Sequence, residues 1–486
     1  MTSTTLYASP ARTEDDAKLP TVVLLYLIGV VAPIEFFLGT VSLTPLRVLL
    51  LAMVIPLTVG LFSGRYGKLL ACDYLFFAHM LWATVAVAVN NPNRVVENVG
   101  SSAVEFLGGY LLARAYIRTP GQFQSLIKIL LWMVILSLPL AIIESKTGRP
   151  VIPHLIESIP GVSTVKIVNM GKRMGLFRVQ NAFAHPIHYG LFCSTAFALT
   201  LVGLKDQMGT GRRIVSALLI SLGVFLSLSS GALLAIILQA GLLTWAFLFR
   251  NVRKRWLLLL GLFGLAYVTI DLLSNRTPTK VFMSYATFSS QTAYYRSIIF
   301  DWGMRNVWAN PVFGLGLRTW LRPAYMKSGS VDNFWLVMAM KYGIPGFILV
   351  TLGYFQGLFK VGLRNLAFSD RVSRLRLAWV ITFAGLSFTL TTVHVWTSIY
   401  SFTFFFFGSG LWMASYSEAE NDSRTHIDVG QRTRVLRYRR SFDSDTSPQK
   451  SSGPMLNRSH EHLNLGELRA RPDNKTEIRY TRFPRK

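Results

Sequence analysis

The feature that most constrains this chain is a series of apolar runs, each long enough to cross a membrane. A membrane-spanning helix needs about 20 consecutive, mostly apolar residues, and about twelve runs meet that requirement. Of the 486 residues, 51% are hydrophobic and only 15% are charged. The sequence therefore predicts an all-α, polytopic integral membrane protein, with spans at about 20–40, 43–62, 69–90, 99–117, 124–143, 185–204, 212–229, 231–249, 255–274, 333–357, 375–393 and 397–415.

Basic residues follow every second predicted span, as the positive-inside rule requires of cytoplasmic loops. Both termini are therefore expected in the cytoplasm. The basic residues lie between the apolar runs, and the tail after Tyr416 adds only +5 to the net charge of +26, so nucleic acid is not an expected partner. Three regions follow from this pattern: a cytoplasmic N-terminal segment, 1–19; a membrane domain, 20–416; and a basic tail, 417–486, which is poor in aromatic residues and predicted to be disordered.

Two long loops, at about 144–184 and 273–332, are predicted on the outer face, the second just before the tenth span. Both contain cations, against the positive-inside trend. An anionic ligand at the outer face is the simplest reason for them. The alternative is solvated loop charge, because long loops cross the membrane regardless of their charge. The candidate ligand-binding residues are Arg173 and Arg178 in the first loop, and Arg296 and Arg318 in the second.

Arg178 and Arg296 are the strongest candidates for contacts with phosphate. A guanidinium is charged at any physiological pH and can bind phosphate through two parallel N–H donors. Two arginines from separate loops could clamp one pyrophosphate, although contact with lipid headgroups is the alternative. Residues 293–309 have the spacing of an amphipathic interfacial helix, with Tyr295, Ile298, Ile299 and Trp302 on one face. Tyr295 is therefore a candidate contact beside Arg296.

Asp332 and Asn333 open the tenth span. A carboxylate at this position is either a helix cap or a group that activates an acceptor hydroxyl as a general base. Asn333 could bind a sugar hydroxyl. His185, a further candidate, precedes Pro186, a residue favoured in the first turn of a helix. Because the histidines lack convincing metal spacing, we expect no metal and no other cofactor. Carboxylates in or beside spans are functional candidates by default, and here they are Glu35, Glu105 and Glu144.

The order of several motifs resembles the O-antigen ligase and O-antigen polymerase superfamily of bacterial inner-membrane glycosyltransferases. The resemblance covers about 178–346 by motif and the whole chain by topology. The segments that carry it are Arg178 to Gly190, Leu226 to Gly231, Tyr295-Arg296, Asn310-Pro-Val-Phe-Gly-Leu-Gly316, Asp332-Asn333 and Tyr342-Gly-Ile-Pro-Gly346.

The resemblance implies a periplasmic active site and a multi-pass protein of the bacterial inner membrane. It assigns Arg178 and Arg296 to the pyrophosphate of a lipid-linked oligosaccharide. Ligases of this superfamily often have His-Asn in place of Asp332-Asn333, and Ser-Arg-Gly in place of Ser229-Ser-Gly231. Both differences favour the exopolysaccharide polymerase branch, in which Asp332 would replace the histidine that orients or activates the acceptor.

The function expected from this resemblance is polymerisation of undecaprenyl-pyrophosphate-linked repeat units into exopolysaccharide or O-antigen. The expected partners are this substrate, the lipid bilayer, a chain-length regulator and a flippase. Three alternatives remain: a ligase that transfers glycan to lipid A core, a secondary transporter, and a non-catalytic partner of a polysaccharide synthase. A transporter of the major facilitator type would have its long link between the sixth and seventh spans, where this chain has only about 205–213.

Overall fold

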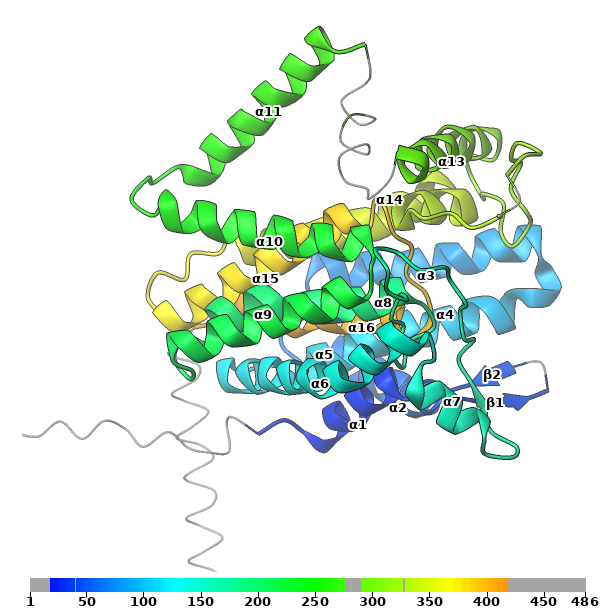
Figure 1. The fold of residues 1–486 in the computed structure, drawn as a ribbon, viewed down its shortest axis with the longest axis horizontal. Coiled ribbons are helices and arrows are strands. Elements are labelled where there is room, and N and C mark those ends of the chain that lie inside the picture. Colours follow the sequence, from blue (N-terminus) through cyan, green and yellow to red (C-terminus); the bar gives the residue numbers. More distant parts are fainter. Residues whose placement is uncertain (1–17, 40, 276–280, 282–289, 327, 418–486) are drawn as a thin grey trace, which may run out of the picture. The chain divides into compact units, whose positions relative to one another are not determined.

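The computed structural model describes residues 18–417, except 40, 276–280, 282–289 and 327 (Figure 1). The predicted N-terminal segment, 1–19, and the predicted tail, 417–486, lie almost wholly outside the described residues. The α-helices are α1 (Thr21–Val31), α2 (Pro45–Phe62), α3 (Ala71–Asn90), α4 (Ser101–Ala103), α5 (Gly109–Tyr116), α6 (Pro120–Thr147), α7 (Val151–Glu157), α8 (Pro186–Ala198), α9 (Thr210–Leu226), α10 (Ser230–Leu248), α11 (Arg255–Leu273), α13 (Ser290–Ala309), α14 (Phe334–Gly362), α15 (Asp370–Thr389) and α16 (Thr397–Gly410). The other elements are the short 3₁₀ and π segments η2 (Pro92–Arg94), η3 (Val96–Gly100), η4 (Val104–Gly108), η5 (Leu199–Gly203) and η6 (Leu411–Ala414), and the strands β1 (Ile34–Leu38), β2 (Val41–Leu43) and β3 (Ser163–Thr164).

Helices occupy every range predicted to span, so the predominantly helical class is confirmed. Seven segments of the described chain are long and apolar enough to cross a membrane. The count of about twelve stays a prediction, because the helices in the other five predicted spans, α1, α5, α9, α15 and α16, are not both long and apolar enough. The seven are Pro45–Phe62, Ala71–Asn90, Pro120–Thr147, Pro186–Gly203, Ser230–Leu248, Arg255–Leu273 and Phe334–Gly362.

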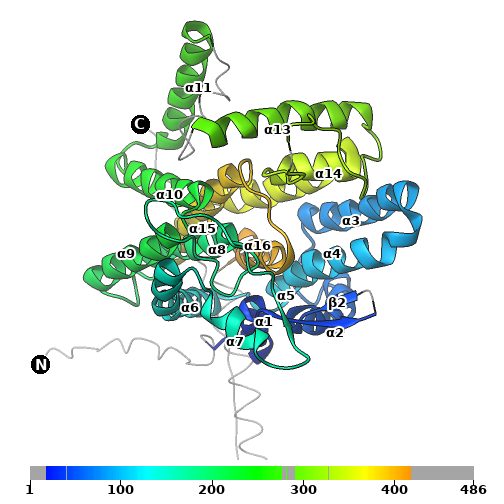
Figure 2. The same ribbon diagram turned by 45° about the vertical axis from the view of Figure 1, so that its right-hand side comes forward.

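Helix α16 forms the centre of the helical bundle, with α5, α8 and α15 around it (Figure 2). Every residue from Ile399 to Gly410 is buried. Its run of phenylalanines is apolar on all sides, which is typical of a helix enclosed by other helices. In contrast, α11 has no buried residue and carries exposed leucines along its length, as expected of a helix that faces lipid.

The prediction of a first span at 20–40 is wrong in its second half. Helix α1 ends at Val31, because Pro33 disfavours helical backbone at Ala32, which is extended. The chain then forms β1 and β2, an antiparallel pair. Strand β1 also pairs with β3 through Ile34 and Glu35, so the three-stranded order is β2-β1-β3. This small sheet, which the sequence analysis did not predict, joins the N-terminal part of the membrane domain to the first long loop.

Helix α14 is broken at Gly343, where φ is 72° and ψ is 178°. The turn that follows α13 fills the break with backbone hydrogen bonds. Leu315 N and Gly316 N donate to the carbonyls of Met340 and Lys341, and Ile344 N donates to the carbonyl of Pro311. These bonds satisfy backbone groups that the break would otherwise leave without partners. The Asn310–Gly316 motif and the Tyr342–Gly346 motif are therefore two halves of one interlocked structure.

Close backbone contact explains why this interlock contains glycines. A Cβ at Gly343 would lie 2.0 Å from the carbonyl oxygen of Val312, and one at Gly314 would lie 2.5 Å from the amide nitrogen of Gly343. The same turn is held from α3, because Asn91 Oδ1 accepts from Leu317 N at 2.8 Å. Arg318, just after the turn, and Lys341, just before the break, line the same cavity.

We expect Gly343→Ala to prevent correct folding. A non-glycine residue in this backbone region costs about 1–3 kcal/mol, and the added methyl group would also overlap the carbonyl of Val312. Thermal unfolding of the purified protein in detergent, and its level in membranes, measure the effect. Gly264→Ala on α11 is the control, because a Cβ there meets nothing within 4 Å. Equal stability of the two variants would contradict this account of the break.

Candidate anion-binding active site

A cavity of about 680 Å³ lies where the two predicted outer loops meet. Its walls come from the loop before α8, the start of α10, α13, the segment before α14, α14 itself and the loop before α16. The lining residues are Met170, Arg173, Arg178, His185, Ile187, Ser229, Ser230, Arg296, Leu315, Gly316, Leu317, Arg318, Trp320, Gly329, Ser330, Val331, Asp332, Val337, Met340, Lys341, His394 and Trp396.

The charge in this cavity is strongly positive. Among its described lining residues, Asp332 is the one carboxylate, and the cations are Arg173, Arg178, Arg296, Arg318 and Lys341. Six predicted site residues thus meet here from segments more than a hundred residues apart: Arg173, Arg178, His185, Arg296, Arg318 and Asp332. An excess of cations in a walled cavity attracts anions strongly.

Arg178 and Arg296 have donors that no described residue uses. The Nε of Arg178, and the Nε and Nη1 of Arg296, are buried without a hydrogen-bond partner in the described part of the chain. Burial, together with the neighbouring Arg173, lowers the pKa of Arg178 to about 10, while Asp332 opposes this shift. Burial also lowers the pKa of Arg296. Both side chains remain cationic near neutral pH, and a bound anion would provide the missing partners.

The structure separates the roles of Asp332 and Asn333. Asn333 is the N-cap of α14, since its Oδ1 accepts from Leu336 N at 3.0 Å. The alternative interpretation of Asp332 as the helix cap is therefore wrong. Asp332 instead accepts a hydrogen bond from Ser330 Oγ at 3.3 Å, and it lines the cavity with the arginines. Its carboxylate has no structural task at the helix end, so it is available to a ligand.

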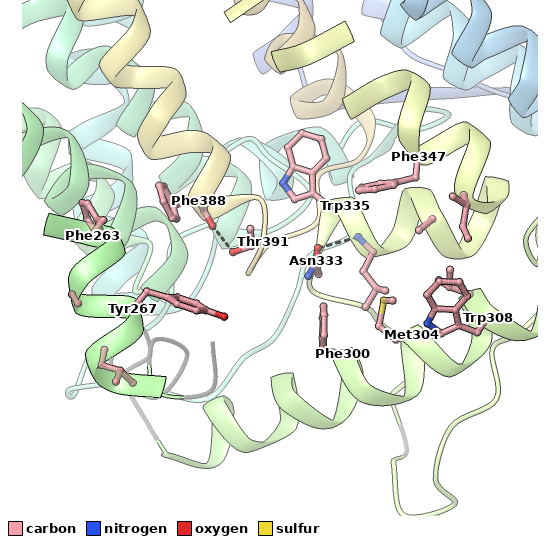
Figure 3. Close-up of a pocket in the computed structure, with 16 residues that line it drawn as sticks. Phe263, Tyr267, Phe300, Met304, Trp308, Asn333, Trp335, Phe347, Phe388 and Thr391 are labelled. Atoms are coloured by element: carbon pink, nitrogen blue, oxygen red, sulfur yellow. Dashed lines mark hydrogen bonds between the residues drawn. The ribbon is translucent and has the colours of Figure 1, made fainter. Parts of the chain in front are cut away.

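The side chain of Asn333 belongs to a second, apolar cavity of about 810 Å³ (Figure 3). Aromatic residues from four helices surround this space, among them Tyr267 on α11, Phe300 on α13, Trp335 on α14 and Phe388 on α15. Asp332 and Asn333 are adjacent in the chain but line different cavities. The start of α14 thus has a cationic cavity on one side and an apolar cavity on the other.

Tyr295 lies outside the cationic cavity. Helix α13 confirms the predicted helix, and Ile298, Ile299 and Trp302 of the predicted face pack as expected. Ile298 and Ile299 are buried, whereas Tyr295 is 40% exposed and the buried position beside it is Arg296. Tyr295 is therefore not among the residues that line the cationic cavity, and Arg296 is buried more deeply than the sequence suggested.

His185 confirms the predicted start of α8 at Pro186, and its side chain is part of the cap. The Nδ1 atom accepts from Ile187 N at 3.2 Å. Burial and the nearby Arg178 lower the pKa of His185 to about 4, so the ring is neutral. A neutral imidazole that accepts at Nδ1 carries its proton on Nε2. His185 can therefore donate a hydrogen bond to a ligand, but it is poorly suited to act as a base.

Sequence reasoning missed several lining residues, among them Lys341, His394 and Trp396. The sequence could have identified Lys341, because a lysine within an apolar run is a functional candidate. His394 and Trp396 lie between the eleventh and twelfth predicted spans, on the predicted outer face, but this short loop contains no Arg or Lys. Burial and the charge of Lys341 lower the pKa of His394 to about 4. Ser229 and Ser230 begin α10 at the edge of the same cavity.

The fold and the site define a multi-pass membrane protein with a cavity rich in cationic side chains. Residues 215–351 match the family model Wzy_C, described as O-antigen ligase. The match includes Arg296, Asp332 and the interlocked turn, and it confirms the resemblance to the O-antigen ligase and polymerase superfamily. It supports an enzyme that acts on lipid-linked sugars in a ligase-like or polymerase-like reaction. A comparison with curated proteins gives no match.

Proposed function

We propose that this chain polymerises undecaprenyl-pyrophosphate-linked oligosaccharide repeat units at the periplasmic face of the bacterial inner membrane. The observation that carries the proposal is the meeting of Arg178, Arg296 and Asp332 in one cavity, where both arginines have unused donors. A pyrophosphate monoester or diester has the charge and the acceptor oxygens that such donors require.

In the proposed reaction, an acceptor sugar hydroxyl attacks the anomeric carbon of the donor glycan. A new C–O bond forms there, and the bond between that carbon and the pyrophosphate oxygen breaks. Asp332 takes the hydroxyl proton as general base. Arg178 and Arg296 stabilise the negative charge that develops on the undecaprenyl pyrophosphate as it leaves. Because the pyrophosphate is already a good leaving group, the reaction requires no nucleotide sugar.

Two features support a polymerase over a ligase. The positions at which the chain departs from the common ligase pattern, Ser230 and Asp332, both line the cationic cavity. A change of residue type at the wall of a substrate cavity points to a different acceptor. The apolar cavity across the start of α14 also suits the isoprenoid part of the carrier, with the pyrophosphate on the cationic side. A chain-length regulator and a flippase would act with such an enzyme.

A strain that lacks this chain separates the candidate functions. If the chain is the polymerase, the strain loses high-molecular-weight glycan and accumulates single repeat units on the lipid carrier. Extraction of lipid-linked glycans and mass spectrometry measure both. Long glycan on the carrier would instead indicate a ligase. Intact glycan assembly would exclude the enzymatic proposal and favour a transporter.

A further inference from the structure

Glu144 lies in the last turns of α6 and is 3% exposed. Both of its carboxylate oxygens accept hydrogen bonds from consecutive backbone amides of the first long loop. Oε1 accepts from Gln180 N at 2.8 Å, and Oε2 accepts from Asn181 N at 2.9 Å. Glu144 does not itself line the cationic cavity. Its role in the described structure is therefore to hold the backbone of this loop.

The backbone at Gln180 and Asn181 is shaped for this contact. Asn181 has a φ of 52°, a left-handed conformation that asparagine adopts more readily than most residues. Its side-chain amide donates to the carbonyl of Ser137, also on α6, at 3.2 Å. Both loop residues are buried, with exposed fractions of 1% and 5%. Without the carboxylate, two buried N–H groups would lose their partner, which favours a shift of the loop.

Arg178 is two residues before Gln180 in the same loop. Its neighbours are held by backbone bonds, from Phe177 N to the carbonyl of Ser145 and from Val179 N to the carbonyl of Leu226. Side-chain substitutions leave those two bonds intact. The link to Glu144 is different, since it depends on one carboxylate that is 34 residues away from the arginine in sequence.

We propose that Glu144 is a positioning residue for Arg178: it fixes the loop so that the guanidinium points into the cationic cavity. This inference rests on the proposed function, because it concerns the same anion-binding site. A displacement of a positioned group by about 1 Å can reduce a rate by about 10²-fold. Glu144 thus contributes to catalysis without touching the substrate.

The test is a double-mutant cycle between Glu144 and Arg178. In Glu144→Gln, the amide oxygen can accept a hydrogen bond from one of the two backbone N–H groups. The side-chain NH₂ group faces the other N–H group and cannot accept from it. We expect about 10²-fold less glycan product in the complemented deletion strain, and weaker binding of inorganic pyrophosphate to the purified full-length chain by titration calorimetry. Arg178→Ala should weaken both. The double variant should be no weaker than Arg178→Ala alone, because coupled residues are not additive.

Two further variants make the test decisive. Glu157→Gln removes an exposed carboxylate from α7 and should leave pyrophosphate binding unchanged. Glu144→Asp keeps the carboxylate, but its shorter side chain no longer reaches both backbone amides. This variant should fold, which thermal unfolding checks, and it should bind pyrophosphate more weakly than the wild type. Wild-type binding by Glu144→Asp, or effects that multiply in the double variant, would overturn the positioning role. Wild-type product and pyrophosphate binding in Arg178→Ala would instead overturn the proposed function.

Discussion

Replacing Arg178 or Arg296 by alanine is expected to abolish most of the glycan product while the protein remains in the membrane. Each guanidinium provides buried donors to the proposed leaving pyrophosphate. Loss of one donor of this kind reduces a rate by about 10²–10³-fold. Lysine should restore little at either position, since it keeps the charge but loses the planar pair of N–H donors. Glycan product per unit of membrane protein measures the effect.

Two arginines outside the cavity are matched controls for this experiment. Arg305 is on α13 with Arg296, but it is exposed and lies over the ring of Trp302. Arg149 is in the same long loop as Arg178 and is also exposed. Alanine at either control position should leave the product near its normal level. Full product from the Arg178 and Arg296 variants would leave the pyrophosphate clamp without support.

The Asp332→Asn variant is expected to fold normally and to lose about 10²-fold or more of its product, the usual scale for losing a general base. The helix cap is not at risk, because Asn333 and not Asp332 accepts from Leu336 N. Asparagine has nearly the size of aspartate but cannot accept the proton of an acceptor hydroxyl. Glycan product and the thermal stability of the purified protein distinguish loss of chemistry from loss of folding.

The adjacent position provides an internal control. Asn333→Asp keeps an N-cap, since aspartate and asparagine cap helices about equally well, and it should retain most of the product. The double variant, with Asn at 332 and Asp at 333, keeps the net charge of the wild-type pair but moves the carboxylate into the cap. We expect this variant to be inactive. Normal product from it would show that the charge, and not its position in the cavity, is what the reaction requires.

The sequence alone predicted the helical class and most of the charged site for one physical reason. Lipid requires long apolar helices, so any interruption rich in arginine is conspicuous. The sequence therefore identified Arg178 and Arg296 as candidate site residues in two separate loops, and both line the cavity. The strands β1 and β2 were not predicted, because residues 34–43 are apolar enough to extend a predicted span, and β3 is only two residues long.

Other predictions failed because the spacing of residues in the sequence does not determine how a helix is oriented or at which residue it begins. Tyr295 and Arg296 are neighbours on α13, and the exact orientation of the helix decides which of them is buried. Which of Asp332 and Asn333 caps α14 depends on where the helix begins, and helix ends are uncertain by one or two residues. Glu144 was a candidate without a location, since its partners are backbone amides of a distant loop.

The loop before α16 has a consequence for how this protein is made. His394 and Trp396 line the cationic cavity, and they are followed within the membrane domain by little more than α16 itself. Arg173 and Arg178, which line the same cavity, are synthesised more than two hundred residues earlier. A chain that is still being inserted therefore exposes its first arginines long before the enclosing wall exists. If the chain binds a lipid-linked pyrophosphate as proposed, the cavity that would hold it is complete only when translation of the membrane domain is nearly finished.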